Sequence, residues 1–161
     1  MKFFEDIAVG EKLELGRVSF TADAIKAFAS RFDPQPFHVD EEAARRSPYG
    51  ALVASGWHTA SVWMRLLVEH YRREDETLRA RGEPLAAFGP SPGFRELKWL
   101  KPVYAGDTIA YQTEVIATRA SNSRPGWGLM TLRNSGINQR GEPVMSFIST
   151  AFVERRTGAA S

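Results

Sequence analysis

The sequence predicts an α+β protein in which an antiparallel β-sheet wraps around one long helix. Three observations support this class. Between positions 53 and 71, apolar side chains recur at alternating spacings of four and three residues, which is the period of a helix with one buried face. Beyond position 93, apolar and polar residues mostly alternate, as they do in strands. Turn signals such as Asn-Gln-Arg-Gly at positions 138–141 separate these strands and favour antiparallel neighbours.

The chain before the long helix predicts one strand and two shorter helices. Residues 13–20 alternate approximately, with a change of phase at a central glycine that indicates a bulged strand. Thr21 is a candidate N-cap for a helix over residues 22–32. Asp40 is a candidate N-cap for a short helix over residues 41–46.

The same patterns predict which side chains are buried. The predicted core stripe of the long helix consists of Val53, Trp57, Ala60, Met64, Leu67 and Tyr71. Residues 72–84 are rich in charge and lose this pattern, so we expect a frayed helix or an exposed loop there. Strands are predicted in the segments 94–101, 109–117, 127–131 and 144–153. The last segment is apolar on part of both faces, which favours an interior position in the sheet.

Length and composition favour a single domain over residues 1–161 and exclude several kinds of site. The 161 residues are 43% hydrophobic, which is enough for a substantial core. Lys and Arg total 21 against 19 for Asp and Glu, so the net charge of +2 gives no case for a nucleic acid or an anionic membrane as partner. The chain has no cysteine, which excludes disulfides, a thiol nucleophile and thiolate metal ligands.

The amino-terminal residues and the hydropathy favour a soluble cytoplasmic protein. The chain begins Met-Lys-Phe-Phe-Glu-Asp, with acidic residues at once and without the apolar segment of a signal peptide. No stretch approaches the length of a transmembrane helix. The histidines do not cluster at metal-ligand spacing and no glycine-rich phosphate loop is present, so we expect neither a metal nor a cofactor.

A short segment between the predicted helices carries the chemistry of greatest interest. Residues 33–38 read Asp-Pro-Gln-Pro-Phe-His and contain one of the three histidines of the chain. The two prolines restrict the backbone, so Asp33 and His38 are expected at a semi-rigid separation. Such a pair suits the handling of one water molecule or one proton. The residues alone are equally compatible with a surface turn, because Asp-Pro is a common turn starter.

Three stretches, in this order, resemble the MaoC-like dehydratase family, whose best-known members are the (R)-specific enoyl-CoA hydratases. Residues 33–38 are similar to its Asp-x-Asn-Pro-x-His motif. Residues 55–61, Ser-Gly-Trp-His-Thr-Ala-Ser, are similar to the His-Gly-x-x-x-Ala-Ser opening of its central helix. Residues 97–107 are similar to its strand and turn with the pattern Phe-x-x-Pro-Val-x-x-Gly-Asp. The resemblance covers nearly the whole chain and implies the hotdog fold.

The resemblance also implies roles for individual residues. Asp33 and His38 would be the catalytic pair, and Ser61 would help to position the active-site groups. Gly56 would present its backbone amide to the thioester carbonyl, which agrees with the free N–H groups and positive dipole end of a helix N-terminus. Gln35 stands where the family has asparagine and would keep the amide chemistry on a longer arm.

The implied reaction is the reversible hydration of an enoyl thioester by a hydro-lyase. Water adds its hydroxyl to C3 and a proton is placed on C2, which requires one group to take a proton and another to deliver one. Which of Asp33 and His38 performs each step stays open at this point. The implied partners are an acyl-CoA substrate and a second copy of the chain, in a homodimer or larger assembly. Candidate contacts for CoA phosphates are Arg95, Lys98, Lys101 and Arg124.

Departures from the family pattern concern the surroundings of the pair. Phe32 stands in place of a glycine and Ser55 in place of a histidine, and both Phe32 and Trp57 are expected to add bulk near the pocket. These changes leave two further functions to be considered. One is a hotdog acyl-CoA thioesterase, in which water attacks the thioester carbonyl. The other is a non-catalytic protein that binds acyl thioesters.

Overall fold

The computed structural model describes residues 1–156 of the chain. The last five positions of the domain predicted over residues 1–161 lie outside the described residues. Along the chain the elements are η1 (Phe4–Asp6), β1 (Lys12–Ser19), α1 (Ala22–Phe32), α2 (Pro36–Val39), α3 (Glu41–Arg45), α4 (Gly56–Ala80), β2 (Gly93–Trp99), β3 (Thr108–Ala120), β4 (Trp127–Asn138) and β5 (Pro143–Glu154).

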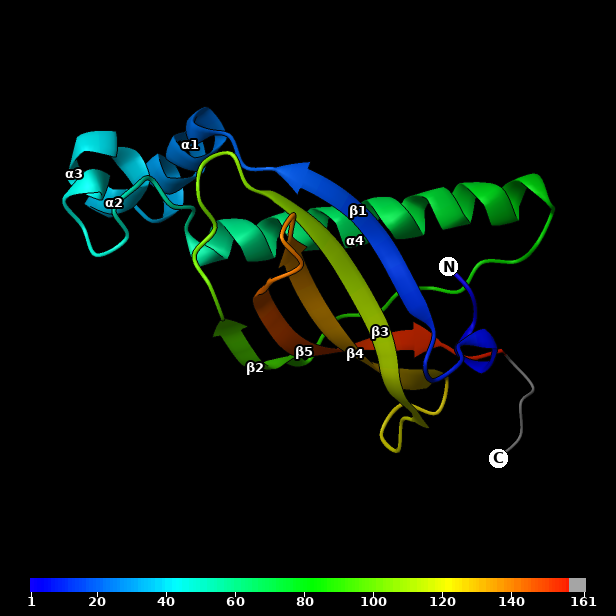
Figure 1. Cartoon of the computed structure of the whole chain (residues 1–161). Helices are drawn as coiled ribbons and strands as arrows, with labels where there is room; N and C mark the ends of the chain where they lie inside the picture. The colour runs from blue at the N-terminus through cyan, green and yellow to red at the C-terminus, as the bar shows by residue number, and fades with distance from the viewer. Residues whose placement is uncertain (157–161) are drawn as a thin grey trace.

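The described strands form one five-stranded antiparallel sheet, in the order β1-β3-β4-β5-β2. The sheet curves, and α4 lies across its concave face (Figure 1). The interior position predicted for the last strand is confirmed, since β5 pairs with β4 on one side and β2 on the other. The predicted bulge is also confirmed, because the β1–β3 register shifts between Glu14 and Gly16.

The core lies between α4 and the sheet. The buried side chains of the helix are Thr59, Val62, Trp63, Leu66 and Leu67. Trp63 donates its indole N–H to the Thr113 hydroxyl at 3.1 Å, and the Tyr111 hydroxyl donates to the Thr59 carbonyl at 3.1 Å. These bonds satisfy polar groups that would otherwise be costly to bury, and they fix the rotation of the helix over the sheet.

This rotation corrects the predicted core stripe. Trp57 and Met64 were assigned to the core, but each is 50% exposed. Val53 was assigned to the same helix, but it precedes the helix and forms an isolated bridge with Tyr104. The spacing of the apolar residues was helical on both faces of α4, so periodicity alone did not determine which face is buried.

The length of α4 also differs from the prediction. Residues 72–80 were expected to be frayed or looped, whereas the helix continues to Ala80. This segment consists mainly of arginine, glutamate, leucine and alanine, which all have high helix propensity. Propensity therefore maintains the helix after the apolar pattern has ended. The helix stops before Gly82, whose φ of +69° suits a helix-terminating turn.

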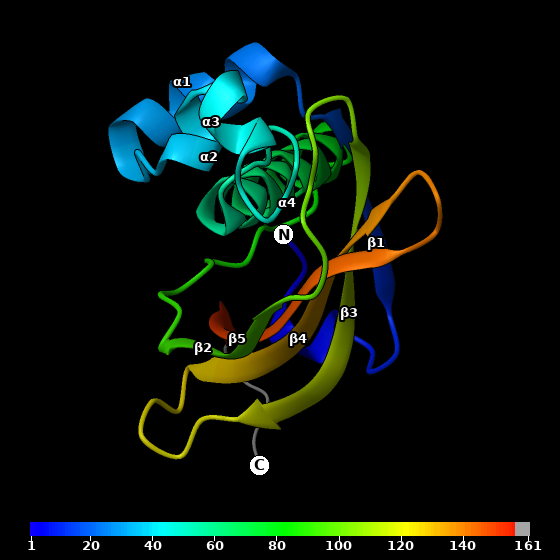
Figure 2. The same ribbon diagram turned by 60° about the vertical axis from the view of Figure 1, so that its left-hand side comes forward.

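Three short helices gather near the start of α4, on its side of the sheet (Figures 1 and 2). Helix α1 has the predicted bounds, and the Thr21 hydroxyl accepts a hydrogen bond from the Ala24 N–H at 3.2 Å. Asp40 caps α3 as predicted by accepting from two backbone N–H groups. Helix α2 was not predicted; it begins with Pro36 at its first turn, a position that proline favours.

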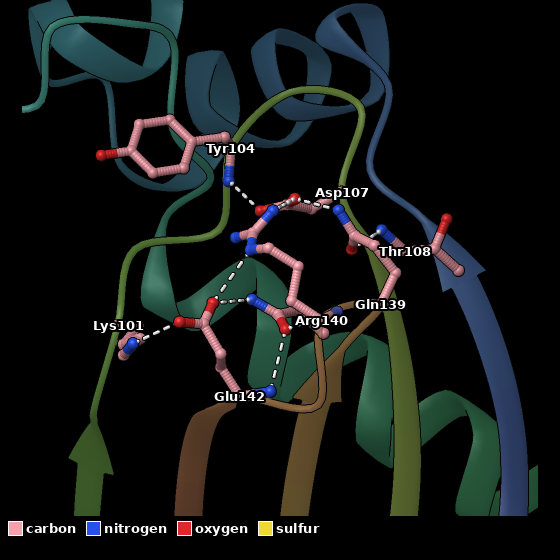
Figure 3. Close-up of polar contacts among 8 residues, drawn as sticks. Lys101, Tyr104, Asp107, Thr108, Gln139, Arg140 and Glu142 are labelled. Carbon is pink, nitrogen blue, oxygen red and sulfur yellow. Dashed lines mark hydrogen bonds and ion pairs between the residues drawn. The ribbon is translucent and has the colours of Figure 1, made fainter.

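A polar cluster at one end of the sheet fixes the loop between β2 and β3 (Figure 3). The buried Asp107 carboxylate accepts from the Tyr104 N–H at 2.9 Å, from Gln139 Nε2 at 2.6 Å and from Arg140 Nη1 at 3.2 Å. These donors come from its own turn and from the β4–β5 turn. The carboxylate therefore joins two loops that are distant in sequence.

Glu142 forms the second half of this cluster (Figure 3). It accepts from Asn138 Nδ2 at 2.8 Å, from Lys101 Nζ at 2.5 Å and from Arg140 Nε at 3.0 Å. These three hydrogen bonds lower the pKa of Glu142 to about 2. We call the set Lys101, Tyr104, Asp107, Asn138, Gln139, Arg140 and Glu142 the Asp107 cluster. None of the helices within the described residues is both long and apolar enough to cross a membrane.

Candidate active site

Asp33 and His38 are brought together by the break between α1 and α2. Asp33 is the C-cap of α1, and its N–H donates to the Ala29 carbonyl at 2.9 Å. His38 lies on the single turn of α2, which Pro36 begins. The turn brings His38 Nε2 to 3.4 Å from Asp33 Oδ2. The His38 side chain is 7% exposed and the Asp33 side chain 19%, so the pair is shielded but reachable.

The main chain determines which nitrogen of His38 carries a proton. Nδ1 lies 2.7 Å from the Val53 carbonyl oxygen. A carbonyl oxygen can only accept, so Nδ1 must donate. In the neutral ring the lone pair is therefore on Nε2, the nitrogen that faces Asp33. Val53 is itself held on both sides, by its N–H to the Phe37 carbonyl at 3.3 Å and by its bridge to Tyr104.

The surroundings of Asp33 favour its ionised form. Burial raises the pKa of the Asp33 carboxyl, but hydrogen bonds from Ser55 and Gln35, and the attraction of His38 in its protonated form, together hold it below its usual value. Gln35 donates from Nε2 to Asp33 Oδ1 at 2.9 Å. Gln35 thus acts on the site by holding one oxygen of the Asp33 carboxylate. The other oxygen then lies next to His38 Nε2.

The N-terminus of α4 forms the opposite side of the site. Gly56 is the first residue of the helix, so its N–H has no acceptor within the helix. Ser55 is the N-cap, and its hydroxyl oxygen accepts from the Trp57 N–H at 3.2 Å. Because the same hydroxyl donates to Asp33, Ser55 links the carboxylate to the helix N-terminus.

These groups surround a cavity of about 410 Å³, which we call the Asp33 cavity. It lies where α1, α2, the start of α4 and the segment after β2 meet. Its lining consists of Asp33, Gln35, Phe37, His38, Tyr49, Val53, Ala54, Gly56, Trp57, Thr59, Trp99, Leu100, Lys101, Pro102, Val103 and Val144. A few polar groups within mostly apolar walls are typical of a small-molecule site.

The structure brings four of the five predicted site residues to this cavity. Asp33, Gln35, His38 and Gly56 all line it. Ser61 does not belong to the described lining, and its side chain is exposed on α4. The functional role predicted for Ser61 therefore lacks a contact with this cavity in the described chain.

The bulk predicted near the pocket proves to be Trp57 rather than Phe32. Trp57 lines the Asp33 cavity, whereas the Phe32 side chain is exposed and contacts Phe28. Sequence reasoning overlooked Ser55 and Trp99. Serine directly before a helical glycine is an N-cap signal that could have indicated Ser55. No local signal indicated Trp99, which reaches the cavity from a distant strand.

His58 lies near the pair in sequence but faces elsewhere. Its ring stacks on Phe28, with centroids 4.5 Å apart, and meets Phe20 edge-on at 4.9 Å. Burial lowers the pKa of His58 to about 4. The residue is thus a neutral ring in an aromatic contact. The described residues contain no group of three or more acidic or histidine side chains arranged to hold a metal ion.

A five-stranded antiparallel sheet wrapped around one long helix places the chain in the hotdog fold class. One solved structure with this likeness is a Mycobacterium tuberculosis protein described as having a double hotdog fold. It is 19% identical, has a TM-score of 0.69, and the match covers 99% of this chain and 46% of that chain. At this identity the likeness concerns the fold, and it confirms the fold that the sequence resemblance implied.

The chain belongs to the MaoC-like dehydratase family, because residues 5–126 match the family described as MaoC like domain. Residues 92–161 also match a family described as mesaconyl-CoA hydratase. A solved MaoC-like dehydratase from Rhodospirillum rubrum is 42% identical with a TM-score of 0.80, over 98% of this chain and 99% of that chain. Mesaconyl-CoA hydratase of Cereibacter sphaeroides is 40% identical over 68 residues, which are 42% of this chain and 20% of that protein. The match therefore spans about a fifth of that curated relative.

Proposed function

We propose that this protein is an (R)-specific enoyl-CoA hydratase or dehydratase in which Asp33 and His38 handle the water. One observation carries the proposal. A carboxylate oxygen and an imidazole lone pair lie 3.4 Å apart at the wall of a cavity that also contains a helix N-terminus. Membership of the MaoC-like family and the similarity to hydratases support the reaction class.

Both groups of the pair accept hydrogen bonds in the proposed resting state. The Asp33 carboxylate is ionised and the neutral His38 presents its lone pair, so one water can donate one O–H to each. As the water oxygen bonds to C3, the pair takes up one of its protons, and a proton passes to C2. The double bond is consumed and no other reactant is required. A positioned acid or base of this kind contributes about 10²–10⁴-fold to the rate.

Gly56 supplies the third element of the proposed mechanism. Addition at C3 pushes negative charge onto the thioester oxygen. The free N–H at the start of α4, with the positive end of the helix dipole, stabilises that charge. Gly56 lines the cavity, and the space that a Cβ would take there is occupied by the Trp99 indole.

The proposed partners are an acyl-CoA and a second copy of the chain, in a cytoplasmic homodimer or larger homo-oligomer. Strand β2 is an edge of the described sheet, and open edges favour pairing with another chain. Exposed apolar side chains on this strand or directly after it are Phe94, Trp99 and Leu100. Light scattering of the purified protein tests the assembly, and a monomer at micromolar concentration contradicts it.

The reaction is tested with a panel of trans-2-enoyl-CoA thioesters and the purified protein. We expect loss of the enoyl absorbance without release of free CoA thiol, and formation of the (3R)-hydroxyacyl-CoA on chiral analysis. Release of thiol as the main outcome would instead assign a thioesterase. Saturable binding without any turnover across the panel would assign a binding protein and reject the enzymatic proposal.

A further inference from the structure

Two tryptophans bound the Asp33 cavity beside the helix N-terminus. Trp57 lies in the first turn of α4 and Trp99 ends β2, and both line the cavity. Trp99 rests directly on Gly56, because a Cβ built there would lie 2.2 Å from Trp99 Cε2. The two indole rings meet edge-on, at 78° with centroids 5.2 Å apart. Because Gly56 has no side chain, the Trp99 indole can lie against the helix backbone. The Trp57 indole in turn packs against Trp99.

Apolar space continues on the far side of Trp57. Trp57 also lines a second cavity, of about 110 Å³, together with Ala60, Met64 and Phe94. Met64 and Phe94 belong in turn to a third cavity, of about 580 Å³, which follows α4. Trp57 thus lies between the Asp33 cavity, with its polar pair, and a larger apolar space.

This arrangement restricts a thioester placed as proposed above. Its carbonyl is at the Gly56 N–H and its C3 is beside Asp33 and His38, so the remaining alkyl chain starts close to the two indoles. Burial of each methylene requires apolar space. An apolar space of about 580 Å³ is reached beyond Trp57 by way of the small second cavity, and Trp57, held by its contact with Trp99, separates that space from the Asp33 cavity.

We propose that Trp57 and Trp99 determine acyl-chain specificity by confining the substrate to short acyl groups. The proposal rests on the proposed hydratase function and adds the substrate class to it. In this proposal the two tryptophans form a wall between the Asp33 cavity and the apolar cavities. Removing the wall would join these cavities.

The test compares hydration of crotonyl-CoA and trans-2-octenoyl-CoA by the full-length protein. We expect the wild type to prefer crotonyl-CoA in kcat/KM. In Trp57→Ala and in Trp99→Ala, the ratio of octenoyl to crotonyl kcat/KM should rise by at least about tenfold, since even one methylene in an apolar pocket can change discrimination by that amount. Trp57→Leu provides a variant of intermediate volume if an alanine variant fails to fold.

Met64→Ala is the matched control. Met64 lines both apolar cavities but not the Asp33 cavity, and its side chain is half exposed. This substitution enlarges the space beyond Trp57 and leaves the wall in place. The single variant should keep the wild-type ratio, while Trp57→Ala combined with Met64→Ala should accept octenoyl-CoA at least as well as Trp57→Ala alone.

Binding of the unreactive thioesters butyryl-CoA and octanoyl-CoA, measured by calorimetry, separates this proposal from the hydratase assignment. If the two tryptophans form such a wall, Trp57→Ala should raise the affinity for octanoyl-CoA relative to that for butyryl-CoA, even if no enoyl-CoA is hydrated. Equal kcat/KM of the wild type for crotonyl-CoA and trans-2-octenoyl-CoA would overturn the proposal. An unchanged ratio in both tryptophan variants, in hydration and in binding, would also overturn it. Absence of all turnover with the binding shift intact would reject only the hydratase function.

Discussion

The Asp33 site and the Asp107 cluster each contain a carboxylate shielded from water, yet the surroundings of the two carboxylates differ. In the Asp107 cluster, three donors from two loops converge on one carboxylate. At the Asp33 site, the carboxylate accepts from Gln35 and Ser55, and its Oδ2 lies 3.4 Å from His38 Nε2 at the wall of a cavity. The first arrangement is complete within the protein. The second leaves a carboxylate oxygen beside the imidazole at a cavity, where we propose that a water molecule donates.

We propose that this difference distinguishes a structural carboxylate from a reactive one. Both residues lie in short sequence motifs of the same family resemblance, Asp33 in residues 33–38 and Asp107 in residues 97–107. Neither residue type nor motif separates the two roles. Access separates them in the structure, because Asp33 lines a cavity beside His38, whereas Asp107 is buried under three donors from two loops.

The largest expected effect comes from removing the charge or the base of the pair. Asp33→Asn and His38→Ala should each lower kcat by about 10²–10⁴-fold, since each removes one member of the proton-handling pair. Asp33→Asn should change the unfolding free energy little, whereas His38→Ala should also lower it by about 1–3 kcal/mol, because it leaves the buried Val53 carbonyl without its donor. Steady-state hydration and chemical denaturation measure the two quantities. Turnover within a factor of two of wild type in both variants would remove Asp33 and His38 from the mechanism.

The same substitution at the second carboxylate should have the opposite outcome. Asp107→Asn places an NH₂ group where three donors converge, so it should cost about 1–3 kcal/mol of unfolding free energy. The activity per folded molecule should remain near wild type at a temperature where the variant is folded. A variant that keeps its stability but loses activity would show that the Asp107 cluster takes part in the reaction.

Ser55 has both a structural role, as the N-cap of α4, and a role at the site, through its hydrogen bond to Asp33. Its substitution should therefore have a smaller effect, on both stability and activity. Ser55→Ala removes the N-cap of α4, which costs about 1 kcal/mol, and it removes a hydrogen bond that lowers the pKa of Asp33. The carboxyl pKa, followed by NMR, should therefore rise, and kcat/KM should fall. Thr21→Ala is the control, because it removes the N-cap of α1 at the end of that helix remote from Asp33. An equal loss of activity in both variants would make the effect of Ser55 purely structural.

The smallest expected effect concerns His58, which extends the comparison to two histidines. His58 is neutral in the fold, with a pKa of about 4 against an ordinary value of 6.5. Between these values the unfolded chain binds more protons, so stability falls as the pH drops from about 6.5 to about 4. His58→Phe keeps a ring between Phe20 and Phe28 and should reduce this fall. Melting temperatures across the pH range measure it, and curves of identical shape would contradict the assignment.

The sequence was sufficient for most of the elements, but not for α2 or the end of α4, and it was insufficient for the rotation of α4 over the sheet. Periodicity and capping residues predicted α1, the bulge in β1 and the interior strand β5. The buried face of α4 was misassigned, because Trp57 and Met64 fit the helical period as well as Val62 and Leu66 do. Only pairing with the sheet decides between such faces.

The site was predictable where it is local in the chain. Asp33, Gln35 and His38 lie within six residues, and the backbone restrictions of proline make their proximity foreseeable. Trp99 and the Val53 carbonyl come from segments placed by tertiary structure. Ser61 illustrates the converse, since it shares a motif with Gly56 but is exposed outside the cavity.

The contact between His38 Nδ1 and the Val53 carbonyl has an evolutionary consequence. The acceptor that fixes the proton on the imidazole is a peptide group, which every amino acid at position 53 would supply. Drift at that position can reshape the wall of the cavity without moving the proton to the other nitrogen. The tautomer of the histidine is thus inherited with the backbone, independently of the side chains that line the cavity.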